Sequence, residues 1–354
     1  MNPVGVWLLR GVSLIAALGV AGTLYQAFAA RRDAARYPPP GRLVDVGGHR
    51  LHLQVMGEAS DGPTIVLDAG LDSFSTNWYW VQRALASSMR VVAYDRAGLG
   101  WSDDGAPPHD AYHSAADLHT ALRHAGLGGP YVLAGHSYGG LVVRAFADEY
   151  PDEVVGLVLV DASHPDQWLH IPMSMRGAVP AFANRALAVL AAFGLLRVAD
   201  VLTPQIATGL PERQYAEMHA IFALPRSSWT GARTLSAWDG LTRPRINRAR
   251  RLGDLPLAVV SVTEQPVVGE TLTALQNELP GLSTNSVHRT VTGATHEDLI
   301  SRREHAEEVA ATIRDVAEVA RTGVRLGATS AAARPPDLGR SEAPGPRRDP
   351  SEVP

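Results

Sequence analysis

Short apolar segments alternate with helical segments from residue 64 onward, and this alternation constrains the fold more than any other feature. Strands are predicted at Thr64–Asp68, Arg90–Tyr94, Tyr131–Ala134, Val155–Val160, Leu257–Val262 and Ser286–Val291. Helices are predicted at Asn77–Ala86, His113–His124, Tyr138–Glu149, Thr271–Glu278 and Arg302–Arg321. Apolar strands joined by helices are typical of a mostly parallel sheet with helices on both faces. The sequence therefore predicts an α/β fold.

Further segments extend this α/β domain, which is predicted to span residues 43–322. Two alternating runs, Leu43–Val46 and His49–Val55, flank a Gly-Gly pair and predict a β-hairpin. Between about residues 165 and 251 the strand signal stops, and Ala, Leu and aromatic residues predict an inserted helical cap. Residues 323–354 are rich in Ala, Pro, Gly, Arg and Ser without periodicity, so a disordered tail is predicted there.

The amino-terminal segment Val4–Ala30 is apolar apart from Arg10. Its part from Gly11 to Ala30 is uncharged and about 20 residues long, enough to span a bilayer. We expect residues 1–36 to form a single membrane anchor. A cleaved signal peptide is the alternative, because residues 27–29 read Ala-Phe-Ala, and a buried helix of a soluble protein is a third reading.

The arginines that follow the apolar segment, Arg31, Arg32 and Arg36, weakly favour a cytoplasmic catalytic domain. The Pro-rich residues 37–42 cannot continue a helix and predict a stiff connector. We expect this connector to isolate the anchor from the sheet.

The composition excludes several kinds of chemistry. The chain has no Cys, so disulfides and thiolate sites are absent, and its 32 basic residues are all Arg, which excludes Schiff-base chemistry on lysine. A net charge of −4 provides no basic face for a phosphate backbone. Nucleic acid is therefore not an expected partner.

A candidate nucleophile lies where the third α/β strand meets its helix. Gly135-His136-Ser137-Tyr138-Gly139 has the G-x-S-x-G pattern at a strand-to-helix turn, which exposes the serine hydroxyl at the start of the helix. A serine needs a base, and without lysine that base is a histidine. His296 is the candidate, because it follows the last predicted strand and precedes the last predicted helix.

These residues, with Leu67–Ser73, Tyr94–Ser102 and Leu159–Pro165, resemble the α/β-hydrolase fold superfamily, in the lineage of small bacterial esterase-like serine hydrolases. The resemblance covers about residues 42–322 except the cap. It implies an oxyanion hole made by the backbone N–H groups of Leu71 and Tyr138, and it implies no cofactor and no metal. It also suggests that Asp95 and Arg96 brace the loops around Ser137.

The acid that would orient His296 departs from the usual superfamily pattern. The usual position, after the strand that follows the cap, is occupied here by Gln265, and an amide cannot stabilise an imidazolium. Asp161, at the end of the preceding strand, matches an alternative superfamily placement and is preferred. Glu264 is the other candidate.

The leading hypothesis is a serine hydrolase that cleaves an ester through an acyl-enzyme. Acyl transfer, perhydrolysis and C–C hydrolysis use the same triad, and a non-catalytic membrane-anchored receptor or scaffold is the alternative from another class. Haloalkane dehalogenases and epoxide hydrolases are disfavoured, because they attack with a carboxylate where Ser137 stands. The cap aromatics suggest an apolar substrate or simply hold the cap in place: Trp168, Phe182, Phe193, Phe222, Trp229 and Trp238.

Overall fold

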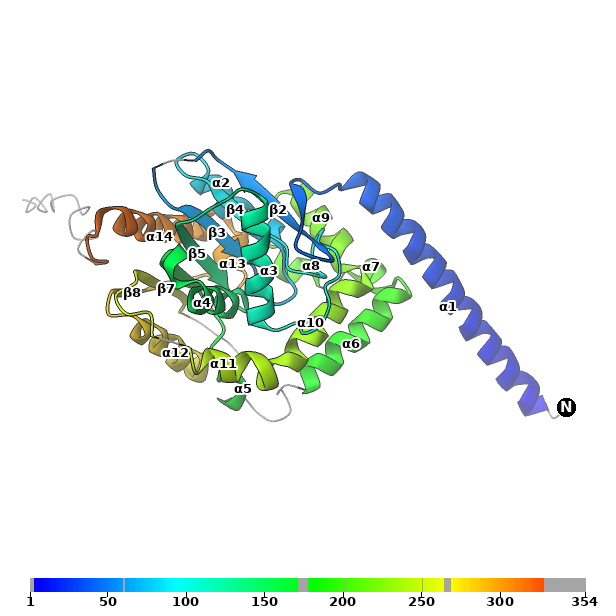
Figure 1. Cartoon of the computed structure of the whole chain (residues 1–354). Helices are drawn as coiled ribbons and strands as arrows, with labels where there is room; N and C mark the ends of the chain where they lie inside the picture. Colours follow the sequence, from blue (N-terminus) through cyan, green and yellow to red (C-terminus); the bar gives the residue numbers. More distant parts are fainter. Residues whose placement is uncertain are drawn as a thin grey trace, which may run out of the picture.

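An eight-stranded sheet forms the centre of the computed structural model (Figure 1). The structure describes residues 3–59, 61–170, 178–200, 202–249, 251–263 and 269–327. The strands are β1 (Arg42–Asp45), β2 (Arg50–Met56), β3 (Thr64–Asp68), β4 (Val91–Tyr94), β5 (Tyr131–His136), β6 (Val154–Val160), β7 (Leu257–Val262) and β8 (Ser286–Val291). Their spatial order is β1-β2-β4-β3-β5-β6-β7-β8. Strand β2 pairs antiparallel with both β1 and β4, and the pairings from β4 through β8 are parallel.

Helices cover both faces of this sheet, as predicted. The elements of the α/β domain outside the cap are η1 (Ser75–Trp78), α2 (Tyr79–Leu85), α3 (Ala111–His124), α4 (Gly139–Glu149), η2 (Pro151–Glu153), α12 (Gly269–Glu278), η5 (Leu279–Leu282), α13 (Asp298–Ser301) and α14 (Arg303–Thr322). Apolar side chains of α3 and α4 pack on one face, and those of α2, α13 and α14 pack on the other. The six predicted strands of this domain are confirmed, with bounds within two residues of those expected.

The inserted segment is a helical cap, and the described residues of this segment contain no strand. Its elements are α5 (Gln167–His170), α6 (Ala178–Ala192), α7 (Leu195–Ala199), α8 (Thr203–Ile206), α9 (Glu212–Phe222), α10 (Pro225–Ala237), the π-helical turn η4 (Trp238–Thr242) and α11 (Arg243–Ile246). A third apolar cluster joins the cap to the domain, with Phe222 of α9 packed against Phe74. The predicted disordered tail falls largely at residues 328–354, which lie outside the described residues.

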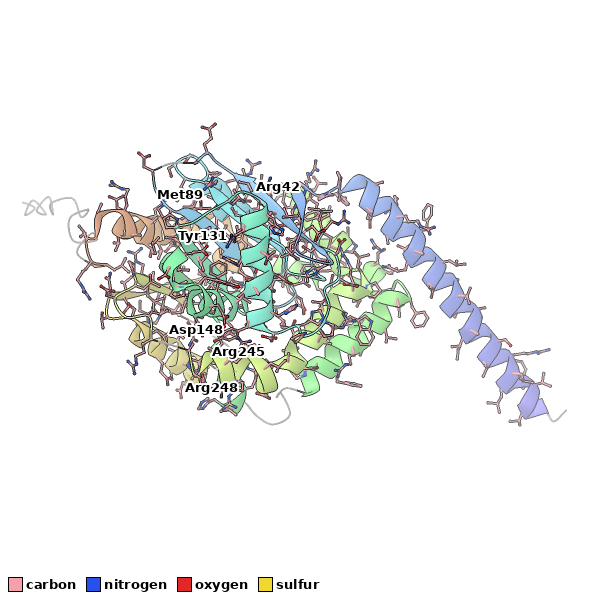
Figure 2. All side chains as sticks on the ribbon, viewed as in Figure 1. Arg42, Met89, Tyr131, Asp148, Arg245 and Arg248 are labelled. Atoms are coloured by element: carbon pink, nitrogen blue, oxygen red, sulfur yellow. The ribbon has the colours of Figure 1, made fainter. Side chains whose placement is uncertain are left out.

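The amino-terminal segment is one continuous helix, α1 (Pro3–Arg36), which is long and apolar enough to cross a membrane. Figure 2 shows that its amino-terminal half projects away from the domain with its side chains on all sides. The helix is nevertheless not isolated from the domain by the connector. Gln26 and Asp33 are buried, and both bind Arg197 of α7. The sequence did not predict this contact between helix and cap.

Two glycines at the start of α4 allow the helix to lie against its neighbours. A Cβ at Gly139 would lie 2.4 Å from the Asp68 carbonyl oxygen, and one at Gly140 would lie 2.3 Å from the Ala162 Cβ. Both distances are too short for real atoms. The close packing of α4 on β3 and on the end of β6 therefore requires glycine at both positions.

Replacement of either glycine by alanine should destabilise the fold. We expect Gly139→Ala and Gly140→Ala each to lower the free energy of unfolding by about 1–3 kcal/mol through overpacking. Gly128→Ala is the matched control, since a Cβ there meets nothing within 4 Å. Chemical denaturation of the three variants measures the difference, and equal stabilities would contradict the packing argument.

Candidate active site

Ser137 lies at a sharp turn between β5 and α4. Its φ of +53° is in the left-handed region, which is unfavourable for a residue with a side chain. Two hydrogen bonds hold it there: Ser137 N–H donates to Val160 C=O at 3.1 Å, and Ser163 N–H donates to Ser137 C=O at 2.9 Å. The turn is thus fixed against the carboxyl end of β6, and Ser137 remains partly exposed.

The loop after β3 lies directly against Ser137. A Cβ at Gly70 would lie 3.4 Å from Ser137 Cβ, so no side chain separates this loop from the serine. Within the described residues, neither the Leu71 N–H nor the Tyr138 N–H has a hydrogen-bond acceptor. These are the two donors that the superfamily resemblance assigns to an oxyanion hole.

The buried guanidinium of Arg96 orients this loop. Arg96 Nη1 donates to Asp68 and to Ala69 C=O, and Nη2 donates to the carbonyls of Gly70 and Leu71. In a trans peptide the N–H points opposite to the preceding C=O. Since Gly70 C=O points at Arg96, the Leu71 N–H points away from Arg96. The expected bracing role of Arg96 agrees with these contacts.

His296 and Asp161 are joined by a hydrogen bond. Asp161 follows β6 with φ +40°, is almost completely buried, and its Oδ2 lies 2.5 Å from His296 Nδ1. Burial lowers the pKa of His296, but the hydrogen bond to Asp161 and the charges of Glu297 and Asp161 outweigh it and raise the pKa to about 9. Glu264, the alternative acid, and Gln265 lie outside the described residues.

Ser137 Oγ and the His296 ring, both described, do not form a hydrogen bond with each other. Nucleophile and base are often loosely placed in the absence of substrate. The two residues nonetheless belong to one group, because the His296 ring centroid lies 4.4 Å from that of His136, which precedes Ser137 in the chain.

His136 supports the loop that carries His296, a role that the sequence did not predict. Its Nε2–H donates to the His296 carbonyl oxygen at 3.0 Å. Burial, with a smaller contribution from the charge of His296, holds the pKa of His136 well below its ordinary value, so the ring is neutral. His136 is a variable position of the G-x-S-x-G pattern, and the pattern does not indicate that this residue binds the backbone of His296.

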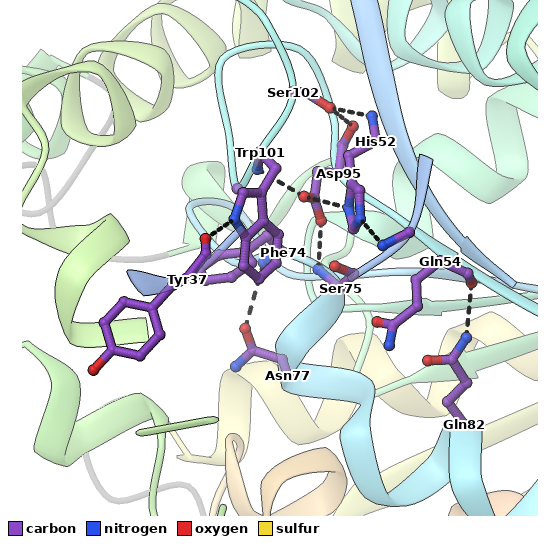
Figure 3. Close-up of polar contacts among 12 residues, drawn as sticks. Tyr37, His52, Gln54, Phe74, Ser75, Asn77, Gln82, Asp95, Trp101 and Ser102 are labelled. Carbon is purple, nitrogen blue, oxygen red and sulfur yellow. Dashed lines mark hydrogen bonds and ion pairs between the residues drawn. The ribbon is translucent and has the colours of Figure 1, made fainter. Parts of the chain in front are cut away.

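Asp95 organises a buried polar cluster beside the site (Figure 3). Its carboxylate accepts hydrogen bonds from Ser75 N–H at 2.8 Å, Trp101 N–H at 2.9 Å and the His52 ring at 2.9 Å. Trp101 Nε1 in turn donates to Tyr37 C=O at 2.9 Å. Burial raises the pKa of Asp95, but these hydrogen bonds and the His52 charge hold it below the ordinary value. The expected structural role of Asp95 agrees with this arrangement.

Asp72 connects the loop that carries Leu71 to the cap. Asn184 of α6 donates to its Oδ2 at 3.3 Å, and its Oδ1 is buried without a partner in the described residues. Burial raises the pKa of Asp72 to about 7. No sequence pattern could have identified this contact, because it joins residues 112 positions apart.

A cavity of about 660 Å³ lies elsewhere, at the base of the cap beside α4 and α11. His164 and Arg144 line it, and neither Ser137 nor His296 does. We therefore place the candidate active site at Ser137, His296 and Asp161 and not at this cavity, despite the size of the cavity. Among the described residues, no group of three or more His, Asp or Glu side chains could hold a metal ion.

The described cap aromatics are not gathered around Ser137. Trp238 is buried against Tyr138 and Trp168, whereas Phe182 and Phe193 face outward and are exposed. The alternative reading, in which aromatics hold the cap on the domain, fits Trp238 and Phe222. The outward-facing phenylalanines fit neither reading.

Comparisons with known proteins agree with this fold. Residues 63–201 match the family model described as alpha/beta hydrolase fold. The wild-type Cfl2 structure from Burkholderia cenocepacia has a TM-score of 0.62 and 24% identity, and the match covers 78% of this chain and 95% of Cfl2. The chain therefore has the α/β-hydrolase fold.

Curated relatives match over shorter lengths. Epoxide hydrolase 4 of Mus musculus is 33% identical over 150 residues, which are 38% of this chain and 41% of that protein. "Probable transporter efuK" of Hormonema carpetanum is 34% identical over 137 residues, 37% of this chain and 20% of that protein. The chain spans about half or less of the length of such relatives.

The pKa of His296 distinguishes the two candidate acids. NMR titration of the His296 ring, assigned by comparison with His296→Asn, should give a value near 9. Asp161→Asn should lower it markedly, because the hydrogen bond to Asp161 is the largest of the raising effects and only the charge of Glu297 then opposes burial. Glu264→Gln should leave it unchanged, and the reverse pattern would identify Glu264 as the partner.

Proposed function

We propose that this chain is a serine hydrolase that cleaves a carboxylic ester through an acyl-enzyme. The observation that carries the proposal is the hydrogen bond between His296 and buried Asp161, formed beside the strained turn of Ser137. A neutral serine hydroxyl is a poor nucleophile, and an oriented imidazole is the usual means of activating it.

The reaction has two stages. In the first stage Ser137 Oγ comes within hydrogen-bond reach of His296 Nε2, which accepts the hydroxyl proton as Oγ attacks the ester carbonyl. The Leu71 and Tyr138 N–H groups stabilise the oxyanion, an effect of about 3–4 kcal/mol for one such donor. His296 then protonates the leaving alcohol. Water, deprotonated by His296, hydrolyses the acyl-enzyme and releases the acid.

Asp161 is the proposed acid of the triad. Its contact with Nδ1 leaves Nε2 facing the serine and stabilises the imidazolium that forms during acylation. The raised pKa means that His296 of the free enzyme becomes fully available as a base only as the pH approaches about 9. The rate at low substrate concentration should therefore rise with pH through the neutral range.

Other chemistry remains possible on the same residues. An acyltransferase, a perhydrolase or a C–C hydrolase would use the same triad, and the substrate is proposed only as a small apolar ester. The similarity to Epoxide hydrolase 4 does not extend the proposal to epoxides, because serine and not a carboxylate stands at the turn. A non-catalytic scaffold is the alternative that the next experiment excludes or supports.

Fluorophosphonate labelling and ester hydrolysis test the proposed nucleophile. The wild-type chain should label and hydrolyse p-nitrophenyl esters, and Ser137→Ala should do neither while unfolding at an unchanged temperature. Asp161→Asn should reduce turnover by about four orders of magnitude, as the corresponding change does in serine proteases. Activity above a few per cent in Ser137→Ala would refute the assignment, and an unlabelled wild type would favour the scaffold.

We also propose that α1 is a retained single-pass membrane anchor. Its apolar amino-terminal half is exposed in the structure, which suits a lipid environment. Cleavage after residue 29 would remove Gln26, which donates to Ala223 C=O at 2.8 Å and accepts from Arg197 at 3.0 Å. A discarded signal peptide has no need of such contacts, so they favour retention.

Two truncations separate anchoring from folding. Removal of residues 1–18 should greatly weaken vesicle binding and leave thermal stability unchanged, because it removes most of the exposed apolar part of α1 and the buried positions of α1 lie beyond residue 18. Removal of residues 1–36 should lower stability as well, since it leaves Arg197 buried without Asp33. Equal stability of both truncations would show that the helix contributes nothing to the fold.

A further inference from the structure

The cap carries an apolar face that the described chain leaves largely exposed. We call it the cap face. Its large exposed residues are Phe182, Val189, Leu190, Phe193, Leu195 and Val198, on or between α6 and α7. Phe182 is 69% and Val198 is 73% exposed, which is unusual for such side chains when they are clustered. This clustering points to an interaction surface.

The cap face is continuous with α1. Gly22 of α1 lies against the backbone of Phe193, where a Cβ would meet the Phe193 carbonyl oxygen at 2.5 Å. An apolar hollow lined by Ile15, Val20 and Leu24 of α1 also includes Phe193. Figure 1 shows α6 and α7 on the side of the domain from which α1 projects. The helix and the cap face thus form one apolar surface.

A buried polar cluster fixes the angle between α1 and the cap. Arg197 binds Gln26 at 3.0 Å and forms an ion pair with Asp33, and Gln26 also reaches Ala223 C=O. All three side chains are buried. Breaking a buried ion pair is unfavourable, so the cap cannot swing freely about the helix. Wherever α1 is held, α6 and α7 are held with it.

The length of the free helix determines how deep the cap lies. From Val4 to Leu18 every large apolar side chain of α1 except half-buried Val6 is exposed, and this part is about 22 Å long. The hydrocarbon layer of a bilayer is about 30 Å thick. A helix that spans it must therefore continue past Gly19, to the level at which it contacts Phe193. Arg10 lies about 9 Å inward from Val4, and its long side chain can extend back toward the opposite boundary.

We propose that the cap face is a second membrane contact, with Phe182, Phe193, Leu195 and Val198 immersed in the bilayer surface beside α1. The inference rests on the proposed anchor. The charge of α6 and α7 fits this partner, because their only charged residues are Arg185 and Arg197, and an exposed arginine suits anionic headgroups. A second copy of the chain is a poorer occupant, since it would leave the apolar surface of α1 uncovered.

The absence of cysteine makes a direct test simple. Full-length variants with one cysteine each, Phe182→Cys and Val198→Cys, carry an environment-sensitive fluorophore in vesicles of phosphatidylcholine and phosphatidylglycerol. Leu14→Cys reports the anchor, and Val324→Cys, exposed just beyond α14, is the control. Quenching by iodide measures exposure to water, and quenching by lipids with a doxyl group near the headgroup measures contact with the bilayer.

We expect the labels at positions 182 and 198 to be quenched by the doxyl lipids and to be at least threefold less sensitive to iodide than the label at 324. Iodide sensitivity equal to that at 324 would refute the cap contact, even with position 14 in lipid. Shielding from both quenchers would mean that another protein copy covers the face. A label at 14 that is not in lipid would refute the anchor and this inference together. None of these readouts depends on catalysis by Ser137.

Discussion

The buried guanidinium of Arg96 is the interaction on which the geometry of the candidate site depends. One side chain binds Asp68 and the three successive carbonyls of residues 69–71. A loop that curves around one cation presents the intervening N–H groups on the side away from that cation. Without this cation the buried Asp68 would be unpaired, and the carbonyls would need other donors. The buried charge of Arg96 thus orders the loop of residues 69–71 beside Ser137.

Much of this arrangement could be predicted from the sequence because it is local. Strands buried on both faces appear as continuous apolar runs, which is why β3 and β7 have the predicted bounds. The turn at Ser137 also has a local signature, since glycine is needed at fixed offsets. The preference for Asp161 over Glu264 came from a mismatch at Gln265, and the contact with His296 agrees with it, although Glu264 lies outside the described residues.

Contacts between distant segments could not be predicted. The buried positions of α1, Gln26, Ala29 and Asp33, recur at helical spacing, but in a largely apolar helix this stripe does not stand out. The same holds for His136, whose partner is a backbone carbonyl 160 residues away. The aromatic residues of the cap could be identified from the sequence, but the direction in which each side chain faces could not. Composition marks them as apolar, but only the packing shows that Phe182 faces outward while Trp238 faces inward.

Helix α6 contacts the loop of the candidate site with one side and carries exposed apolar side chains on the other. One side of it holds buried Ala181 and Ala188 and contacts Asp72 through Asn184, while Phe182 and Val189 lie on its exposed side. Asp72 directly follows Leu71, whose N–H is a proposed oxyanion donor. A displacement of α6 would therefore act on the oxyanion loop through the hydrogen bond between Asn184 and Asp72. Burial raises the pKa of Asp72 to about 7, so the acceptor of this hydrogen bond changes its charge near neutral pH. The contact between the cap and the loop of Leu71 thus depends on the protonation of one buried carboxyl group.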